Sequence, residues 1–228
     1  MTNAVVLLSG GLDSVVSLAV LKQKYSEFLA LTFDYGQKSV SSEIKAVKEI
    51  SNYYDIKNQI IKLDWLGKIS NSALNNKTSV PVLNENELDN INISKNTANL
   101  VWVPNRNALF INIAASFAEA FGYNDIIIGA NKEEGETFID NSKEFITNIN
   151  NSLKYSVNSK IEVKAPLIDM TKEEIVKKGI ELNIPFHLIY SCYNGNGKHC
   201  GKCESCLRLK RALKNCSKFD IIDNIFGE

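Results

Sequence analysis

Short apolar runs alternate with amphipathic stretches in the first part of the chain. Residues 4–8, 28–33 and 59–63 are short and mostly apolar, which is typical of strands buried on both faces of a sheet. Between the first two runs, an apolar segment that starts at residue 13 or 14 and ends at about residue 24 predicts a helix. Residues 44–54 carry one apolar stripe at helical spacing and predict a second helix.

The same alternation returns in the second part of the chain. A helical pattern covers residues 110–121, and residues 125–129 and 161–164 predict two further strands. A T-x-x-E capping box at Thr171 begins another helix, and a basic helix follows over residues 207–214. Strands that alternate with helices predict an α/β fold with a doubly wound parallel sheet.

Residues 75–99 interrupt this pattern with eight asparagines, acidic side chains and a single proline. Such a composition predicts a long surface excursion, which is either a lid over a site or a merely solvated insertion. A chain of 228 residues suits one domain. We therefore expect one domain over residues 1–228, with a small cysteine-rich segment within residues 186–215.

The charge balance excludes some classes of partner. Lys plus Arg and Asp plus Glu each number 26, so the chain has no net field that would recruit nucleic acid or an anionic membrane. We therefore expect no stable binding of nucleic acid. The N-terminal residues lack the pattern of a secretory signal, and no run approaches the roughly 18 apolar residues of a membrane span. These features predict a cytoplasmic protein without a membrane anchor.

The most specific motif follows the first predicted strand and precedes the first predicted helix. It is the hexapeptide Ser9-Gly10-Gly11-Leu12-Asp13-Ser14. Two glycines let the backbone turn tightly and bring its N–H groups to a phosphate, and the helix N-terminus favours the same negative charge. The Asp13 carboxylate suits the magnesium ion that accompanies the phosphates. The alternative is an ordinary Gly-Gly turn between a strand and a helix.

The motif lacks the lysine of the Walker pattern and the spacing of the G-x-G-x-x-G dinucleotide pattern. It resembles the loop of the PP-loop ATP pyrophosphatases, which transfer AMP to a substrate oxygen and release pyrophosphate. Adenylation turns a carboxylate oxygen into a good leaving group, and a site that holds pyrophosphate and magnesium stabilises the developing charge. The resemblance assigns ATP binding to Leu8, Ser9, Gly10, Gly11, Leu12, Asp13, Ser14, Val15, Val16, Ser17 and Leu18.

Four of the five cysteines lie within fifteen residues near the C-terminus, at Cys192, Cys200, Cys203 and Cys206. Four thiolates are the ligand set of a closed tetrahedral zinc site. Because no position stays open for water or substrate, we expect a structural zinc ion that fastens the C-terminal segment. Disulfides, unmetallated core cysteines and an iron–sulfur cluster are the alternatives. Cys216 lies outside the group and is expected to be an inert thiol.

The loop and the four cysteines, in this order, resemble the 7-cyano-7-deazaguanine synthase (QueC) family of the PP-loop superfamily. The resemblance spans nearly the whole chain and includes further sequence blocks. They are Phe33-Asp34-Tyr35-Gly36-Gln37, Val103-Pro104-Asn105-Arg106-Asn107, Ile128-Gly129-Ala130-Asn131, Pro166-Leu167-Ile168-Asp169-Met170-Thr171-Lys172 and Ser191-Cys192-Tyr193. The resemblance implies a Rossmann-like fold of the adenine nucleotide α-hydrolase type, with a small C-terminal segment that binds zinc.

In that family, ATP activates 7-carboxy-7-deazaguanine as an adenylate, ammonia gives the amide, and a second activation dehydrates the amide to the nitrile. The resemblance therefore implies an ATP- and Mg²⁺-dependent carbon–nitrogen ligase of queuosine- or archaeosine-type 7-deazaguanine biosynthesis. The expected catalytic residues are Asp13, Ser14 and Arg106, since an arginine near a helix N-terminus can hold a phosphate or carboxylate with two hydrogen bonds. The expected substrate-binding residues are Tyr35, Gln37, Asn107, Glu133, Phe138, Asp140 and Lys164.

Several of these residues follow the strand that ends at Gly129, where α/β sheets bind their ligands. Either Glu133 or Asp140 can accept hydrogen bonds from a guanine-like edge, and Phe138 can stack on the ring. Lys164 can meet a phosphate. Each has an alternative in ordinary loop, core or surface packing, as does the arginine.

The chain departs from the commoner family pattern at several positions. Lys38 replaces the usual arginine after Gln37, Ile139 replaces a proline and Asn141 replaces a cysteine. The altered loop resembles a second branch of the family. The departures leave the final product open between the nitrile, an amide and an adduct with another amine.

Two other classes of function compete with this interpretation. A tRNA thiolase or lysidine synthetase uses a similar loop, but such enzymes usually carry RNA-binding modules or a basic surface, and thiolases need a free reactive cysteine. A zinc-knuckle binding protein with a relic nucleotide fold is the second class, and consumption of ATP distinguishes it. The sequence does not determine the oligomeric state, and a homodimer is compatible with it.

Overall fold

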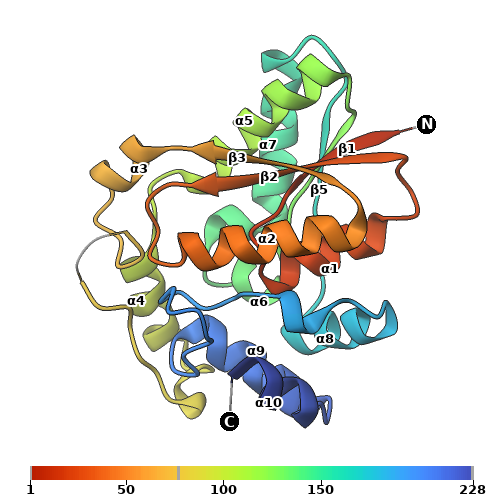
Figure 1. The fold of residues 1–228 in the computed structure, drawn as a ribbon. Coiled ribbons are helices and arrows are strands. Elements are labelled where there is room, and N and C mark those ends of the chain that lie inside the picture. Colours follow the sequence, from red (N-terminus) through yellow and green to blue (C-terminus); the bar gives the residue numbers. More distant parts are fainter. Residues whose placement is uncertain (1, 76–77, 227–228) are drawn as a thin grey trace.

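The computed structural model describes residues 2–75 and 78–226. A sheet of five parallel strands forms its centre, in the order β3-β2-β1-β4-β5 (Figure 1). The strands are β1 (Asn3–Leu7), β2 (Glu27–Asp34), β3 (Lys57–Lys62), β4 (Asp125–Ile127) and β5 (Glu162–Lys164). The apolar runs of the sequence therefore form the buried interior of one parallel sheet, as predicted.

Helices cover both faces of the sheet. The helices α1 (Leu12–Leu21) and α2 (Val40–Tyr54) pack on one face, and α5 (Arg106–Phe121) and α7 (Lys143–Ser156) pack on the other. Alternate residues of β1 divide the two cores, because Ala4 and Val6 join the first and Val5 joins the second. This arrangement confirms the predicted doubly wound α/β fold.

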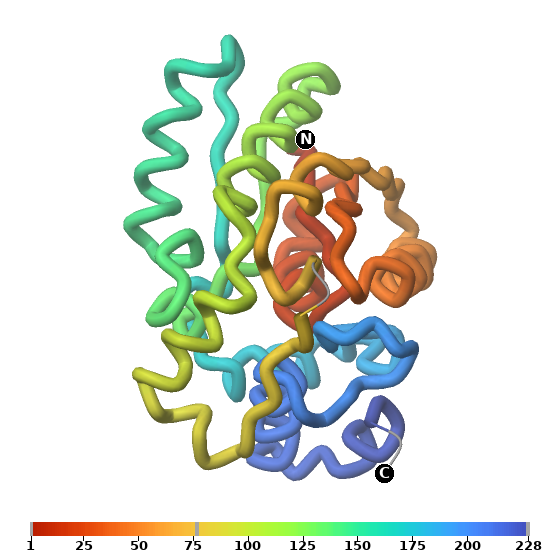
Figure 2. Tube along the Cα trace, turned by 90° about the vertical axis from the view of Figure 1, so that its left-hand side faces the viewer, coloured from red at the N-terminus to blue at the C-terminus, as the bar shows by residue number. Residues whose placement is uncertain are grey.

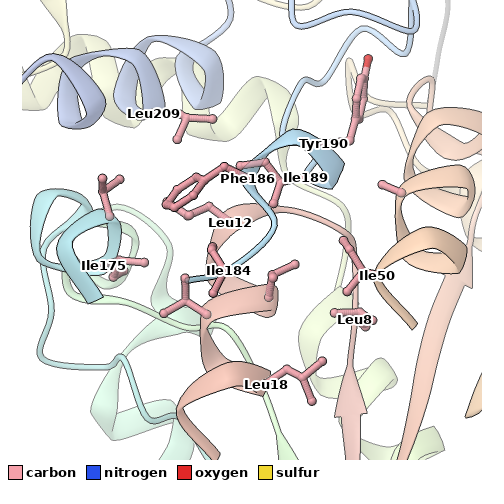
Figure 3. Close-up of a cluster of buried hydrophobic side chains, with 14 of the residues drawn as sticks. Leu8, Leu12, Leu18, Ile50, Ile175, Ile184, Phe186, Ile189, Tyr190 and Leu209 are labelled. Carbon is pink, nitrogen blue, oxygen red and sulfur yellow. The ribbon is translucent and has the colours of Figure 1, made fainter. Parts of the chain in front are cut away.

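Three further helices enlarge the core around α1 and α2. They are α8 (Lys172–Glu181), α9 (Glu204–Asn215) and α10 (Phe219–Phe226). Figure 3 shows part of this core, in which Leu12 and Ile175 lie near Phe186 and Leu209. The C-terminal part of the chain is thus packed onto the nucleotide-loop side of the sheet. The remaining elements are α3 (Asp64–Ile69), α6 (Lys132–Gly135), η2 (Ile139–Asn141) and η3 (Phe186–Leu188).

The strand order determines where a site can form. The chain adds β2 and β3 on one side of β1 and then crosses to add β4 and β5 on the other side. The order therefore reverses between β1 and β4, and such sheets bind ligands outside the carboxyl ends of the strands at this switch point. The hexapeptide loop follows β1 directly and lies at this position.

The Asn-rich segment, predicted as a long surface excursion, contains helical elements that the sequence pattern did not predict. Residues 76 and 77 lie outside the described chain, but the rest of the segment contains η1 (Glu85–Glu87) and most of α4 (Ile91–Val101). Figure 2 shows this yellow segment beside the blue C-terminal segment. Leu83 and Leu88 pack against Leu207 of α9 in a small separate core.

Asparagine itself explains why the sequence concealed these elements. Asn90 begins α4, because its side-chain oxygen accepts hydrogen bonds from the backbone N–H groups of Asn92 and Ile93. Asparagine is among the best residues at this capping position, although its frequency suggested irregular structure. The segment is also tied to α9, since Asp89 pairs with Arg211 at 2.8 Å.

Among the described residues, the helices α3, α6, α7 and α10 were not predicted either. The helix α7 buries only Ile149 and Leu153 fully, so its apolar stripe is narrow and its composition is mostly polar. The helix α10 is short and follows a tight turn after α9. Within residues 2–75 and 78–226, none of the helices combines the length and apolar character that crossing a membrane requires.

Candidate active site and cysteine cluster

A cavity of about 270 Å³ opens at the carboxyl ends of β1, β2 and β4. The loop after β1, the start of α5, the loop after β4 and the start of α8 all contribute to its walls. The cysteine segment closes another side through Ser191 and Tyr193. One cavity therefore brings together segments from the whole length of the chain.

The hexapeptide loop forms one end of the cavity. Gly10 adopts a φ of +81°, and a Cβ there would lie 3.0 Å from the Ala46 Cβ, so a side chain would be both strained and crowded. The Ser14 hydroxyl donates to the Gly11 carbonyl at 3.0 Å, and the Ser9 and Ser14 hydroxyls lie 3.2 Å apart. The two serines thus hold the turn from inside.

A second glycine lets the strand β4 meet this loop. A Cβ on Gly129 would lie 2.9 Å from the Ser14 backbone nitrogen, a distance that side chains do not tolerate. Only glycine allows this approach, which brings the residues after β4 to the hexapeptide end of the cavity. The sequence block around Gly129 therefore has a specific steric reason.

The eleven residues assigned to ATP binding divide into two groups. Those that line the cavity are Leu8, Ser9, Gly11, Leu12, Asp13 and Ser14. The side chains of Val15, Val16 and Leu18 face the core, and Ser17 donates to the Ile128 carbonyl at 3.4 Å. Gly10 supplies the turn and also stays out of the cavity wall, so five residues of the hexapeptide and Leu8 form this wall. The first turns of the helix lie behind it.

Asp13 is the most constrained side chain of the loop. Its Oδ2 atom accepts a hydrogen bond from the Lys172 ammonium at 2.6 Å, and Lys172 also lies 3.4 Å from Glu134 Oε1. Its Oδ1 atom is buried and has no hydrogen-bond partner among the described residues. Burial raises the pKa of the Asp13 carboxyl to about 6, although the Lys172 ammonium acts in the opposite direction.

Arg106 begins α5 and forms part of the opposite wall. Its guanidinium donates to the Tyr35 hydroxyl at 3.3 Å and lies over the same ring, 6.0 Å from its centroid. Burial raises the pKa of the Tyr35 hydroxyl, and the charge of Arg106 opposes this rise. The neighbouring Asn107 also lines the cavity and donates to the Asp140 carbonyl at 3.2 Å. The structure therefore brings Arg106, Tyr35 and Asn107 together.

Gln37 lies behind the cavity and not in its wall. Its amide donates to the Phe33 carbonyl at 2.9 Å and to Glu43 Oε2 at 2.8 Å, and its oxygen accepts from the Tyr35 N–H. Glu43 of α2 lines the cavity instead, and Ser39 donates to its other oxygen at 2.5 Å. Burial raises the pKa of the Glu43 carboxyl, and these hydrogen bonds oppose it.

The loop after β4 presents different residues from those expected. Both oxygens of Glu133 are engaged outside the cavity, with the Lys172 backbone N–H at 2.7 Å and the Arg208 guanidinium at 3.0 Å. Its neighbour Glu134 lines the cavity, as does Phe138, which stacks on Trp102 with centroids 6.4 Å apart.

Two more predicted residues lie outside the cavity wall. Burial raises the pKa of the Asp140 carboxyl against the influence of Arg106, but Asn141 is the residue of this turn that lines the cavity. Lys164 is held away from the cavity by Asp125 at 3.0 Å and by the Tyr25 hydroxyl at 3.3 Å. Lys172, eight residues later in the sequence, lines the cavity instead.

The four cysteines predicted as metal ligands meet in one cluster. All four Sγ atoms lie within 4.8 Å of one another, and the thiols are free. Backbone N–H groups of Asn194 and Cys200 point at the Cys192 sulfur at 3.4 Å. Such donors stabilise thiolates, so the cluster can bind a metal ion.

Comparisons with known proteins agree with this architecture. Residues 3–217 match the model of the family described as Queuosine biosynthesis protein QueC. A 7-cyano-7-deazaguanine synthase from Methanobrevibacter smithii is 50% identical to this chain, with 93% of each protein covered. A 7-cyano-7-deazaguanine synthase from Methanosphaera stadtmanae is 48% identical, with 96% of each covered.

Among solved structures, the U34-tRNA thiolase NcsA from Methanococcus maripaludis, with its [4Fe-4S] cluster, shares the fold. Its TM-score is 0.50 at 17% identity, and the match covers 97% of this chain and 70% of the thiolase. That similarity concerns the fold alone, whereas the family match and the two relatives extend over nearly the whole sequence. The chain therefore belongs to the QueC family.

Proposed function

We propose that this protein is an ATP-dependent ligase that converts 7-carboxy-7-deazaguanine and ammonia to 7-cyano-7-deazaguanine, a step of queuosine- or archaeosine-type 7-deazaguanine biosynthesis. Its relatives carry the name of this activity over nearly the whole chain. One structural observation supports it most directly: the phosphate loop with Asp13 shares a cavity with the Arg106 guanidinium and the Phe138 ring. Nucleotide, carboxylate and planar ring can therefore meet in one cavity.

The phosphate end suits ATP with Mg²⁺. We assign the pyrophosphate to the loop N–H groups and to Ser14, and the metal to Asp13, whose buried Oδ1 atom has no partner among the described residues. When bound, Mg²⁺ supplies positive charge against the departing pyrophosphate. Lys172 keeps Asp13 in its ionised form and can contact a phosphate from the same position.

The other end suits a guanine-like substrate. We assign its carboxylate to Arg106 and its ring to Phe138. Glu43 at this end, and Glu134 from the loop beside Lys172, are wall carboxylates that can accept hydrogen bonds from the N–H edge of the heterocycle. Tyr35 and Asn107 orient Arg106 and the neighbouring loop, and Asp140 acts through its backbone contact with Asn107.

The reaction requires two activations. A carboxylate oxygen attacks the α-phosphorus of ATP and pyrophosphate leaves. Ammonia then attacks the acyl carbon, AMP leaves and the nitrogen gives up a proton. In the second round the amide oxygen attacks the α-phosphorus of another ATP and pyrophosphate leaves again. Loss of AMP and of the remaining two nitrogen-bound protons then gives the nitrile. Arg106 and the loop N–H groups hold the charged groups in line for both rounds.

We propose zinc as the metal of the cysteine cluster. Four sulfur ligands without an open position suit a structural tetrahedral site. Free thiols of this kind persist in a reducing compartment, which supports a cytoplasmic location. The role assigned to zinc is to hold the segment before α9 against the rest of the domain.

Product analysis tests the proposed function. The metal-loaded protein is supplied with 7-carboxy-7-deazaguanine, ATP and ammonium, and the products are identified by mass spectrometry. The expected result is the nitrile, with two AMP and two pyrophosphate formed per nitrile. Supplied amide should also give the nitrile with one ATP consumed. The experiment with supplied amide is necessary because the loop with Ile139 and Asn141 departs from the commoner family pattern. If the amide is not converted, the function is restricted to amide formation or to acylation of another amine.

A further inference from the structure

The phosphate loop is contacted by a segment far away in the sequence. The Tyr190 backbone N–H donates to the Gly10 carbonyl at 2.8 Å. The Leu12 N–H, at the first turn of α1, donates to the Ser191 hydroxyl oxygen at 3.3 Å. Figure 3 shows Tyr190 and Leu12 in the same core region. Two successive residues of the cysteine segment thus hold both sides of the Gly-Gly turn.

The Ser191 hydroxyl is the hydroxyl at this turn whose proton remains available. Ser14 donates its proton to the Gly11 carbonyl, and Ser9 then donates its own to Ser14. Ser191 lines the cavity, and within the described chain its hydroxyl makes only the contact in which it accepts from Leu12. It can therefore donate to a phosphate oxygen while it accepts from the helix N-terminus, and each bond polarises the other.

The cysteine cluster determines the position of this hydroxyl. The Ser191 N–H donates to His199 Nε2 at 3.0 Å. His199 is 6% exposed and packs between Tyr190 and Phe226, with ring centroids 5.1 and 5.2 Å away. Ser191 directly precedes Cys192, and His199 directly precedes Cys200. A metal ion bound by these two cysteines fixes both members of the Ser191–His199 pair.

We propose that Ser191 binds the phosphates of ATP as a distant member of the loop, and that the metal of the cysteine cluster positions it through His199. This inference rests on the proposed function, since it requires ATP in the loop. Ser191 is then a ligand of the nucleotide and His199 a positioning residue. The metal site, beyond its structural role, controls the affinity for nucleotide.

Binding of ATP to the metal-loaded protein tests the assignment, measured by calorimetric titration. Ser191→Ala should weaken ATP binding roughly 10-fold, because a hydrogen bond to a charged group is lost. Ser191→Thr keeps the hydroxyl and should bind ATP as the wild type does. Ser42→Ala is the matched control, because Ser42 also joins the cysteine segment to the domain, through the Gly195 carbonyl at 3.3 Å, but does not line the cavity.

A second measurement tests the coupling without using activity. The coupling between the nucleotide site and the cysteine cluster is reciprocal, so bound ATP must raise the affinity of the cluster for its metal. The rate of metal release to a chelator should fall when ATP is added to the wild type, and it should respond less in Ser191→Ala. If the wild type released the metal at equal rates with and without ATP, the proposed coupling between the two sites would be wrong.

The outcomes separate this inference from the proposed function. If the wild type does not bind ATP, the proposed function fails. If the wild type binds ATP and Ser191→Ala binds it equally well, only the role of Ser191 fails. Loss of metal from purified Ser191→Ala would also overturn the inference, because the hydroxyl would then support the fold and not the phosphate.

Discussion

The two ends of the cavity are built in different ways. At the phosphate end, six consecutive residues supply the turn, the hydroxyls and the carboxylate, and hydrogen bonds between Ser9, Gly11 and Ser14 help to fix the turn. At the opposite end, the wall combines Glu43 of α2, Arg106 of α5 and Phe138 from the loop before η2. The first end depends on local backbone geometry, and the second depends on how helices pack.

The two ends of the cavity also differ in charge. At the phosphate end, Asp13, Lys172 and Glu134 form a partly buried group with one more negative than positive charge, which suits an added cation. At the other end Arg106 is held against neutral Tyr35, so its positive charge remains available for a substrate anion. The predictions below test this division, beginning with the largest expected effect.

Asp13→Asn should reduce turnover by roughly 10³-fold or more, because the charge that faces the metal and pyrophosphate is lost. The fold should remain, since the amide fills the same volume. Steady-state turnover and thermal unfolding measure the two effects. Asp169→Asn is the control, because Asp169 pairs with Lys143 at the surface, and it should retain activity.

The nucleotide products add a second criterion for the phosphate end. Wild-type turnover should release AMP and pyrophosphate. Stoichiometric ADP and phosphate would replace adenylation with acyl phosphate chemistry on the same loop.

Cys200→Ser should remove the metal and lower the free energy of unfolding by more than about 4 kcal/mol, the range typical of a lost metal site. Metal content by elemental analysis and unfolding by denaturant measure the change. Cys216→Ser should keep the metal and nearly all of the stability, because Cys216 lies outside the cluster. Iron in place of zinc in the freshly purified wild type would contradict the assignment of the metal.

Glu134→Gln and Glu133→Gln form a matched pair for the loop after β4. Glu134→Gln should lower kcat/KM roughly 10- to 100-fold, the effect of losing one hydrogen bond to a charged group in the cavity. Glu133→Gln should mainly lower stability, by about 1–3 kcal/mol, because the partly buried Arg208 guanidinium loses one of its two carboxylate partners and keeps only Glu204. Kinetics and denaturant unfolding of both variants distinguish the roles. If Glu133→Gln lowered kcat/KM more than Glu134→Gln does, Glu133 and not Glu134 would be the residue that binds the substrate.

The pH profile gives the smallest and most specific effect. Since the pKa of Asp13 is raised to about 6, kcat/KM for ATP should decline as the pH falls through this value and protonates the carboxylate. The decline should be about tenfold per pH unit below the pKa. Lys172→Met removes the charge that lowers this pKa, so its acid limb should move to higher pH. If kcat/KM declined at the same pH in the wild type and in Lys172→Met, a group other than Asp13 would be responsible for the decline.

The phosphate loop, the cysteine cluster and the strand–helix alternation could be predicted because each follows from contiguous residues or from regular spacing. A Gly-Gly turn after a strand and three cysteines at intervals of three specify local geometry whatever surrounds them. The order of these elements also predicted the α/β class, since parallel strands need crossover helices. The sequence thus determined the type of chemistry at one end of the cavity.

Tertiary structure alone decided which polar side chains reach the cavity. Glu133 and Glu134 are adjacent in sequence, but successive residues of a helix point to different faces, so one meets Arg208 and the other meets Lys172. Gln37 and Lys164 were predicted as substrate contacts, and both are held by protein groups elsewhere. The contact of Ser191 with Leu12 spans 179 residues and has no local signal. Such contacts depend on how the helices and the cysteine segment pack around the sheet, and local spacing does not encode that packing.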